Sequence, residues 1–290
     1  MNRQMMTTAD LSVLTLQCPD QPGIVAAVAN LISDAGGNIA NADQHTDRDS
    51  AVFLQRIEID GAVDWTAFNL GLAQLIERFS MQHTLHLPGT RDRLVIACSA
   101  ELYCAADLLT RVSLGELDVD VVALISDKPA AGELAAQHGI PFRLLDGGLA
   151  GDARAAQEAA FAEALDELEP DLVVLARYMR ILPESITLRW NGRMINIHHS
   201  FLPAFAGAKP YHRAHQRGVK LIGATAHYVT AELDAGPIIA QGITSVSHRD
   251  EVEDLVRKGR DVERTTLANA VRLHLEHRVL VWDNRTCVFA

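Results

Sequence analysis

The first 88 residues carry the hydrophobic patterns of four strands and two helices. Leu11–Gln17 and Met81–Leu87 alternate apolar and polar residues, as half-buried strands do. Ile24–Ala35 and Trp65–Phe79 repeat apolar residues at helical spacing. The sequence also predicts a strand pair around a polar turn, from Asn38–Thr46 and Ala51–Ile59. The resulting order, strand–helix–strand–strand–helix–strand, is typical of a ferredoxin-like domain.

Turn-forming residues mark where these elements end. Gly36-Gly37 is a natural stop for the first helix. The predicted buried face of that helix is Val25, Val28, Ala29, Leu31 and Ile32. Pro88–Asp92 has the composition of a linker, and the pattern changes after it. We therefore expect a first domain over residues 1–88 and a second over residues 89–290.

Beyond the linker, short apolar segments alternate with helical ones. The predicted strands are Arg93–Ser99, Val119–Ser126, Pro141–Leu145, Asp171–Ala176 and Arg193–His198. The predicted helices between them are Glu101–Val112, Ala130–His138 and Asp152–Leu168. Such alternation predicts an α/β domain, in which a doubly wound, mostly parallel sheet is covered by helices on both faces.

The end of the chain has a different pattern. Val219–Thr230 and Pro237–Val246 are predicted to form a longer strand pair. Asp250–His277 reads as a long helix that is interrupted near Gly259. Arg278–Trp282 and Thr286–Phe289 predict a small terminal hairpin.

Composition excludes several classes of protein. The 26 basic and 37 acidic residues give a formal charge of −11, which disfavours binding to a phosphate backbone. No apolar run reaches the roughly 20 residues of a membrane helix, and no secretory signal is visible. Cys18, Cys98, Cys104 and Cys287 form no CxxC pair, which argues against disulfides and a cysteine-rich zinc site. We expect a reduced, cytoplasmic protein.

Candidate chemistry gathers at the end of the predicted strand Arg193–His198. Asn196 and His198 point to the same side of a strand, because side chains alternate. An amide and an imidazole on one face can both reach one oxygen atom, which is the geometry that stabilises an oxyanion in acyl transfer. The carboxyl end of a strand is also where ligands bind in open α/β sheets.

A second polar group follows in the next strand and its loop. Thr225 and His227 share a face of the predicted strand. Asp234 lies in a loop bounded by glycine and proline, where a carboxylate could accept a proton or hold an imidazole in its productive state.

Other readings of these residues stay open. Histidines at strand ends are commonly structural, and Asp234 could form an Asx turn. A zinc site is a further alternative, from His198, His199, His212, His215 and His227. The first two of these lack the helical spacing of common zinc enzymes, so we expect no metal and no cofactor. Ser99–Cys104, after the first strand of the second domain, contains no glycine, which disfavours a phosphate site there.

Several motifs together resemble a known family. They are Asn196-Ile197-His198, Ser200–Pro203, Gly223–His227 and Leu233–Ile239, and they resemble the folate-dependent formyltransferase fold. Asp20–Val25 is similar to the corresponding segment of an ACT domain, a module that often binds amino acids. An ACT domain fused to this hydrolase domain resembles the formyltetrahydrofolate deformylase family. Transformylases of the same fold hold a ribonucleotide phosphate in a glycine-rich loop, which Ser99–Cys104 does not copy, and this favours water as the acceptor.

The resemblance implies hydrolysis of 10-formyltetrahydrofolate to tetrahydrofolate and formate, within one-carbon and purine metabolism. Asn196 would donate to the formyl oxygen, His198 would stabilise the oxyanion or transfer a proton, and Asp234 would assist the attacking water. The substrate would be held by Met179, Arg180, Ile181, Leu182, Thr225, His227, Thr230 and Glu232. An effector site would lie near Asp20, Gly23, Ile24 and Asn38, with methionine or glycine as effector types of the family.

The resemblance also implies partners and rivals. Because ACT domains often pair with another copy, we expect a homo-oligomer, a dimer or a tetramer. A formyltransferase that passes the formyl group to an amine is the nearest alternative. A protein that only senses amino acids is the alternative without catalysis.

Overall fold

The structure, a computed structural model, describes residues 11–145, 150–203 and 210–289. Contacts divide the chain into two compact units. One unit runs to Thr90 and also takes in Glu276–Leu280 and the residues from Cys287 on. The other consists of Arg91–Leu275 and Val281–Thr286. The start of the chain, where no secretory signal is expected, lies outside the described residues.

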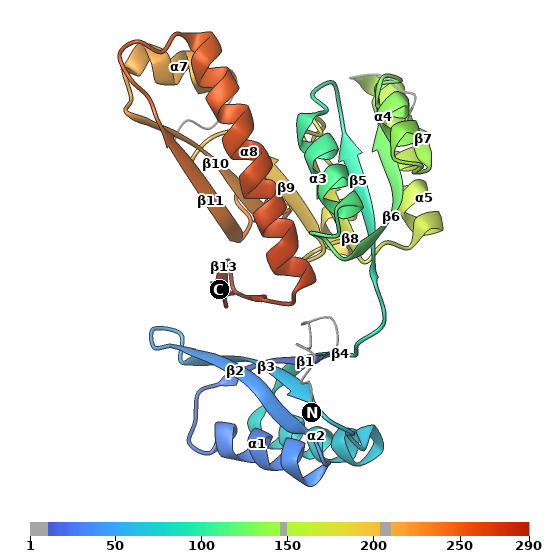
Figure 1. The fold of residues 1–290 in the computed structure, drawn as a ribbon, viewed down its shortest axis with the longest axis vertical. Helices are drawn as coiled ribbons and strands as arrows, with labels where there is room; N and C mark the ends of the chain where they lie inside the picture. Colours follow the sequence, from blue (N-terminus) through green and yellow to red (C-terminus); the bar gives the residue numbers. More distant parts are fainter. Residues whose placement is uncertain (1–10, 146–149, 204–209, 290) are drawn as a thin grey trace. The chain divides into compact units, whose positions relative to one another are not determined.

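The first unit is a four-stranded antiparallel sheet with two helices on one face (Figure 1). Its elements are β1 (Ser12–Pro19), α1 (Ile24–Asp34), β2 (Asn38–Asp47), β3 (Val52–Asp60), α2 (Trp65–Phe79) and β4 (Gln82–His86). The strand order β2-β3-β1-β4 is that of the ferredoxin-like arrangement, so the predicted element order is confirmed.

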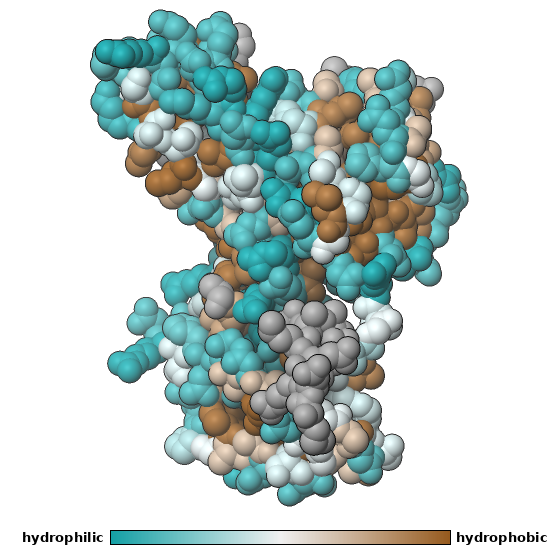
Figure 2. Space-filling view, viewed as in Figure 1, coloured by the Kyte–Doolittle hydropathy of each residue, from teal (hydrophilic) through white to brown (hydrophobic). Residues whose placement is uncertain are grey.

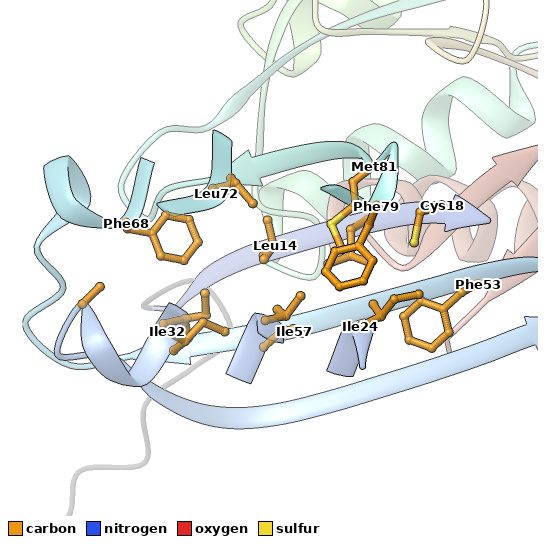
Figure 3. Close-up of a cluster of buried hydrophobic side chains, with 14 residues drawn as sticks. Leu14, Cys18, Ile24, Ile32, Phe53, Ile57, Phe68, Leu72, Phe79 and Met81 are labelled. Carbon is orange, nitrogen blue, oxygen red and sulfur yellow. The ribbon is translucent and has the colours of Figure 1, made fainter. Parts of the chain in front are cut away.

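A hydrophobic cluster joins this sheet to its helices, and Figure 3 shows its side chains converging. From α1 it takes Ile24, Val28 and Ile32, which lie four residues apart on one helical stripe. The prediction that Val25 belongs to this buried face is wrong, because Val25 lies one residue off the stripe and is 43% exposed. Phe68, Leu72 and Phe79 complete the cluster from α2.

The first unit also binds part of the C-terminal segment. Arg56 on β3 is 1% exposed and pairs with Glu58 at 2.7 Å. Its Nε and Nη2 atoms donate to the carbonyl oxygens of His277 and Glu276, at 3.1 and 3.0 Å. These bonds explain why Glu276–Leu280 groups with residues 12–90 rather than, as predicted, with the second domain.

The second unit is a seven-stranded sheet of order β11-β10-β9-β8-β5-β6-β7. The strands are β5 (Asp92–Cys98), β6 (Val119–Ser126), β7 (Phe142–Leu144), β8 (Leu172–Leu175), β9 (Met194–His198), β10 (Leu221–Tyr228) and β11 (Ile238–Ser245). Strands β5 to β9 run parallel, whereas β10 and β11 are antiparallel to their neighbours. The predicted fold class, doubly wound and mostly parallel, is confirmed.

Helices cover this sheet (Figure 1). They are α3 (Tyr103–Ser113), α4 (Ala131–Gln137), α5 (Gly151–Leu168), α6 (Glu184–Arg189), α7 (Pro210–Arg217) and α8 (Val252–Leu275). The short helices α6 and α7 were not predicted, since neither is long enough to show a period. The predicted interruption at Gly259 is wrong, because α8 runs through it unbroken. Strands β12 (Val279–Trp282) and β13 (Arg285–Val288) form the predicted hairpin.

Hydrophobic residues show in Figure 2 over β10 and β11 and also over the side of the second unit that holds β5 and β6. Leu221 on β10 and Ile243 on β11 are 53% and 56% exposed. None of the helices in the described part of the chain is both long and apolar enough to cross a membrane.

Candidate active site

A cavity of about 360 Å³ opens beside β8 and β9 in the second unit. Three segments form most of its wall: Arg177–Leu182 after β8, Asn196–His199 at the end of β9, and Val229–Asp234 after β10. Strand order reverses next to this place, since β6 lies on one side of β5 and β8 on the other. Open α/β sheets bind ligands at such a switch point, as the sequence predicts.

An imidazole and a carboxylate meet in this cavity. His198 Nδ1 lies 3.2 Å from Asp234 Oδ1, and the His198 residue is 7% exposed. The hydrogen bond from His198 lowers the pKa of Asp234 below its ordinary value, with burial opposing this shift and the electrostatic effect of His198 adding to it. Asp234 is therefore ionised at neutral pH. Because Nδ1 faces the carboxylate, Nε2 is the edge of the ring that remains for a ligand, and among the described residues it has no hydrogen-bond partner.

Neighbouring strands bring Asn196 against His227. The two residues are paired across β9 and β10, with Asn196 Nδ2 3.3 Å from His227 Nε2. His227 Nδ1 lies 2.9 Å from the carbonyl oxygen of Tyr228, to which it can only donate. Burial lowers the pKa of His227, against the opposing effects of that carbonyl and of Asp234. The ring is thus neutral with its proton on Nδ1, so Nε2 accepts from Asn196 and fixes the orientation of the amide.

His199 lies beside His198 but has a different environment. Its ring stacks on that of His198 with centroids 5.0 Å apart. Burial, together with the charges of Arg177 and His198, lowers the pKa of His199 to about 4. His199 is therefore uncharged at neutral pH and lies outside the pair of His198 with Asp234.

Comparison with known proteins places this geometry in a family. The sequence profile for formyl transferase matches residues 92–271, and the profile for the ACT domain matches residues 12–64. A formyltetrahydrofolate deformylase from Synechocystis sp. is 48% identical over 288 residues, covering 96% of this chain and 98% of the relative. The chain belongs to the formyltetrahydrofolate deformylase family. The family's enzymes are hydrolases, so the predicted enzyme class is confirmed.

Solved structures agree with this assignment. The crystal structure of a formyltetrahydrofolate deformylase from Pseudomonas syringae pv. tomato matches with a TM-score of 0.93 and 44% identity, covering 97% of this chain and 94% of that one. The glycinamide ribonucleotide transformylase 1 of Symbiobacterium toebii matches with a TM-score of 0.66 and 33% identity. The transformylase covers 71% of this chain, and this chain covers 98% of it. Deformylases and transformylases therefore share the fold of the second unit.

Most of the residues predicted to hold the substrate line the cavity. Met179, Arg180, Ile181, Leu182, His227, Thr230 and Glu232 all lie in its wall. Thr230 also donates to the carbonyl oxygen of Glu232 at 3.0 Å, which shapes the loop that ends at Asp234.

Thr225 has a different position from the one predicted. It is fully buried and does not line the cavity. Its Oγ1 donates to the carbonyl oxygen of Ser200 and accepts from the amide of Leu202, both at 3.0 Å. Gln241 on β11 also donates to this oxygen, at 3.1 Å. Thr225 thus binds the backbone of residues 200–202, which follow His198. Because its hydroxyl is occupied by these bonds, it does not reach the cavity.

Sequence reasoning missed Asp127, which anchors the wall of the cavity. Arg180 Nε donates to Asp127 Oδ2 at 3.1 Å, and the Asp127 side chain is 4% exposed. Burial by itself would raise the pKa of Asp127, but the bonds from Arg180, Ser99 and Lys128 hold it below its ordinary value. Ser99 Oγ also accepts from the amide of Met179 at 3.2 Å. Asp127 directly follows β6, so its place at a carboxyl strand end was the signal that could have found it.

The four predicted effector residues do not form one cluster. Asp20, Gly23 and Ile24 lie where β1 passes into α1, next to the end of β3 that begins at Val52. Asn38 pairs with Asp60 at the opposite end of β3. Ile24 is 2% exposed and belongs to the hydrophobic cluster of the first unit, so its side chain faces away from any ligand at the surface.

The described part of the chain contains no set of ligands for the zinc alternative. There, no group of three or more histidine, cysteine, aspartate or glutamate residues is arranged to hold a metal ion. The expectation of a reaction without a cofactor stays a prediction.

Proposed function

We propose that this chain hydrolyses 10-formyltetrahydrofolate to tetrahydrofolate and formate. The pairing of His198 with Asp234 inside the cavity carries the proposal, because it puts a general base and an imidazole next to the amide of Asn196. The names of the family's relatives agree with it, since the relative from Synechocystis sp. is a formyltetrahydrofolate deformylase.

The proposed mechanism follows ordinary acyl chemistry. Asp234 accepts a proton from a water molecule as its oxygen attacks the formyl carbon. Asn196 Nδ2 and His198 Nε2 donate to the oxyanion of the tetrahedral intermediate, which is the interaction that lowers the barrier. Collapse of the intermediate breaks the carbon–nitrogen bond, and N10 of the folate takes up the proton that Asp234 had accepted. The product leaves as formic acid, which loses its remaining proton to solvent and becomes formate. We propose that no metal or cofactor takes part, because these donors already meet the developing charge.

The rim of the cavity suits an aromatic heterocycle. Met179, Ile181 and Leu233 are 60%, 58% and 62% exposed, although each is apolar. Exposed apolar side chains around a cavity are typical of a binding site that a ligand covers. We propose that the pterin of the substrate binds between these side chains and the backbone of residues 179–182.

The decisive experiment measures formate released from 10-formyltetrahydrofolate by the purified protein, with no amine present. Steady release is the expected result. No release, together with transfer of the formyl group to an added amine, would replace the proposal by the transferase alternative. Binding of methionine or glycine without any turnover of folate would replace it by the amino-acid sensor.

The proposal extends to regulation, assembly and pathway. The ACT match over residues 12–64 supports binding of an amino-acid effector, and we propose methionine or glycine. The assay above is repeated with each amino acid, and a change in the rate of formate release identifies the effector. We also propose that the chain forms a homo-oligomer, and light scattering of the purified protein measures its mass. We propose further that it is a cytoplasmic enzyme of one-carbon and purine metabolism.

We predict that Asp127→Asn raises KM for 10-formyltetrahydrofolate about tenfold and changes kcat little. The substitution leaves Arg180 facing a neutral amide, and loss of one partner from a buried ion pair is costly. The wall of the cavity then shifts, whereas His198 and Asp234 keep their contact. Steady-state kinetics of formate release measures both constants.

A matched variant for this test is Asp107→Asn. Asp107 pairs with Arg111 on α3 at 2.7 Å, and neither residue lines the cavity. Both kinetic constants should stay at the wild-type values in that variant. Equal changes in the two variants, or a loss of kcat alone in Asp127→Asn, would contradict the positioning role of Asp127.

A further inference from the structure

A buried polar network lies between the cavity and the turn that follows β5. Glu263 on α8 is 1% exposed, and both of its carboxylate oxygens are occupied. Oε2 accepts from the Tyr103 hydroxyl at 2.5 Å, and Oε1 accepts from the Tyr211 hydroxyl at 2.6 Å. Arg177 Nε lies 3.5 Å from Oε2. We call Tyr103, Arg177, Tyr211 and Glu263 the Glu263 network.

The fold makes specific room for this network. A Cβ atom at Gly259 would lie 2.0 Å from the Tyr211 hydroxyl, so only glycine leaves space for that ring. Glycine is unfavourable in the middle of a helix, and α8 nevertheless continues through it. On the other side, Tyr103 is the first residue of α3. Two phenol rings therefore fill the volume between α3, α7 and α8.

The network pairs one cation with one anion and two phenols. Burial and the charge of Glu263 raise the pKa of both tyrosines above their ordinary value, so they remain neutral donors. Arg177 is the one cation in the network, and Glu263 is its one anion. Arg177 also lines the active-site cavity, which makes it the group through which the network meets a ligand.

The position of the network matters for the choice of acceptor. In doubly wound sheets the turn after the first strand and the following helix N-terminus bind phosphate. Here that turn, after β5, leads directly into Tyr103, whose hydroxyl donates to the buried carboxylate of Glu263. The transformylase from Symbiobacterium toebii, which shares the fold, acts on a ribonucleotide, and a ribonucleotide carries a phosphate. The two proteins must therefore differ in side chains at this place rather than in architecture.

We propose that the Glu263 network excludes phosphorylated amine acceptors from the site and so leaves water as the only acceptor. The carboxylate repels a phosphate, and the two phenols occupy the volume that the phosphate would need. Glu263 also neutralises Arg177, which would otherwise attract the anion into the cavity. This inference deepens the proposed hydrolysis and rests on it for its meaning, because it explains why the formyl group passes to water.

Binding of glycinamide ribonucleotide, measured by calorimetry without folate, tests the proposal. The wild-type chain should bind it too weakly to detect. Glu263→Gln keeps the shape of the side chain and removes its charge, so Arg177 becomes an unbalanced cation. Affinity should rise at least about tenfold in this variant, and further in Tyr103→Ala/Glu263→Gln, where space opens as well.

The control is Glu167→Gln, which makes the same change of charge at an exposed carboxylate 2.9 Å from Arg143, away from the turn after β5. It should bind the ribonucleotide no better than the wild type. The proposal is overturned if Glu263→Gln, shown to be folded by its thermal unfolding curve, binds no more tightly than the wild type, or if Glu167→Gln gains as much. Tight binding by the wild-type chain also overturns it, and that measurement needs no variant. Because folate is absent, failure here is distinguishable from a failure to release formate.

Discussion

Asp234→Asn should fold normally and release formate at least about 10³-fold more slowly than the wild type. General-base assistance contributes roughly 10²–10⁴ to such reactions, and this variant also removes the charge that faces His198. Folding should be preserved because Asp234 has a φ of 56°, a left-handed conformation that asparagine adopts as readily as aspartate. The measurement is kcat for formate release, together with a thermal unfolding curve.

Asp283→Asn is the matched control for this variant. Asp283 is exposed and also has a positive φ, of 50°, so the control repeats both the change of charge and the backbone requirement. Its rate should equal that of the wild type. If Asp234→Asn turns over at the wild-type rate, Asp234 takes no part in the chemistry, and the proposed mechanism is wrong.

His198→Asn should lower kcat by about 10²–10³, which corresponds to roughly 3–4 kcal/mol of lost transition-state stabilisation. The amide nitrogen of asparagine can replace Nδ1 as a donor to Asp234, but nothing replaces Nε2. The variant therefore separates the contribution of Nε2 from that of Nδ1. His248→Gln, at an exposed histidine away from the cavity, controls for the loss of an imidazole.

The double variant decides whether the two residues act as one unit. If His198 and Asp234 depend on each other, His198→Asn/Asp234→Asn should be hardly slower than the slower single variant. Multiplying effects would instead mean that each residue acts separately on the reaction. In that case the contact of 3.2 Å between them would have no catalytic meaning.

The candidate residues His198 and Asp234 could be found in the sequence for different reasons. Asn196 and His198 alternate on a strand, so their common face followed from local geometry. Asp234 was found as a polar residue in a glycine- and proline-bounded loop, and the structure brings it to His198. Thr225 and His227 also share a face, yet only His227 reaches the cavity. Which of two side chains on one face meets a ligand depends on what packs against it, and no local pattern contains that.

Local patterns in the sequence were enough to predict the order of the elements, the two kinds of sheet and the strand end at which the candidate residues lie. These features follow from the spacing of apolar residues and from turn residues, which act over a few positions along the chain. The tertiary structure alone decided the binding of Arg56 to Glu276 and His277, the ion pair of Asp127 with Arg180, and the Glu263 network. Each of these contacts joins groups on separate elements. A buried charge is tolerated only where the fold brings a partner group to it. Such contacts are set by packing in three dimensions, which the periodicity of one segment does not record.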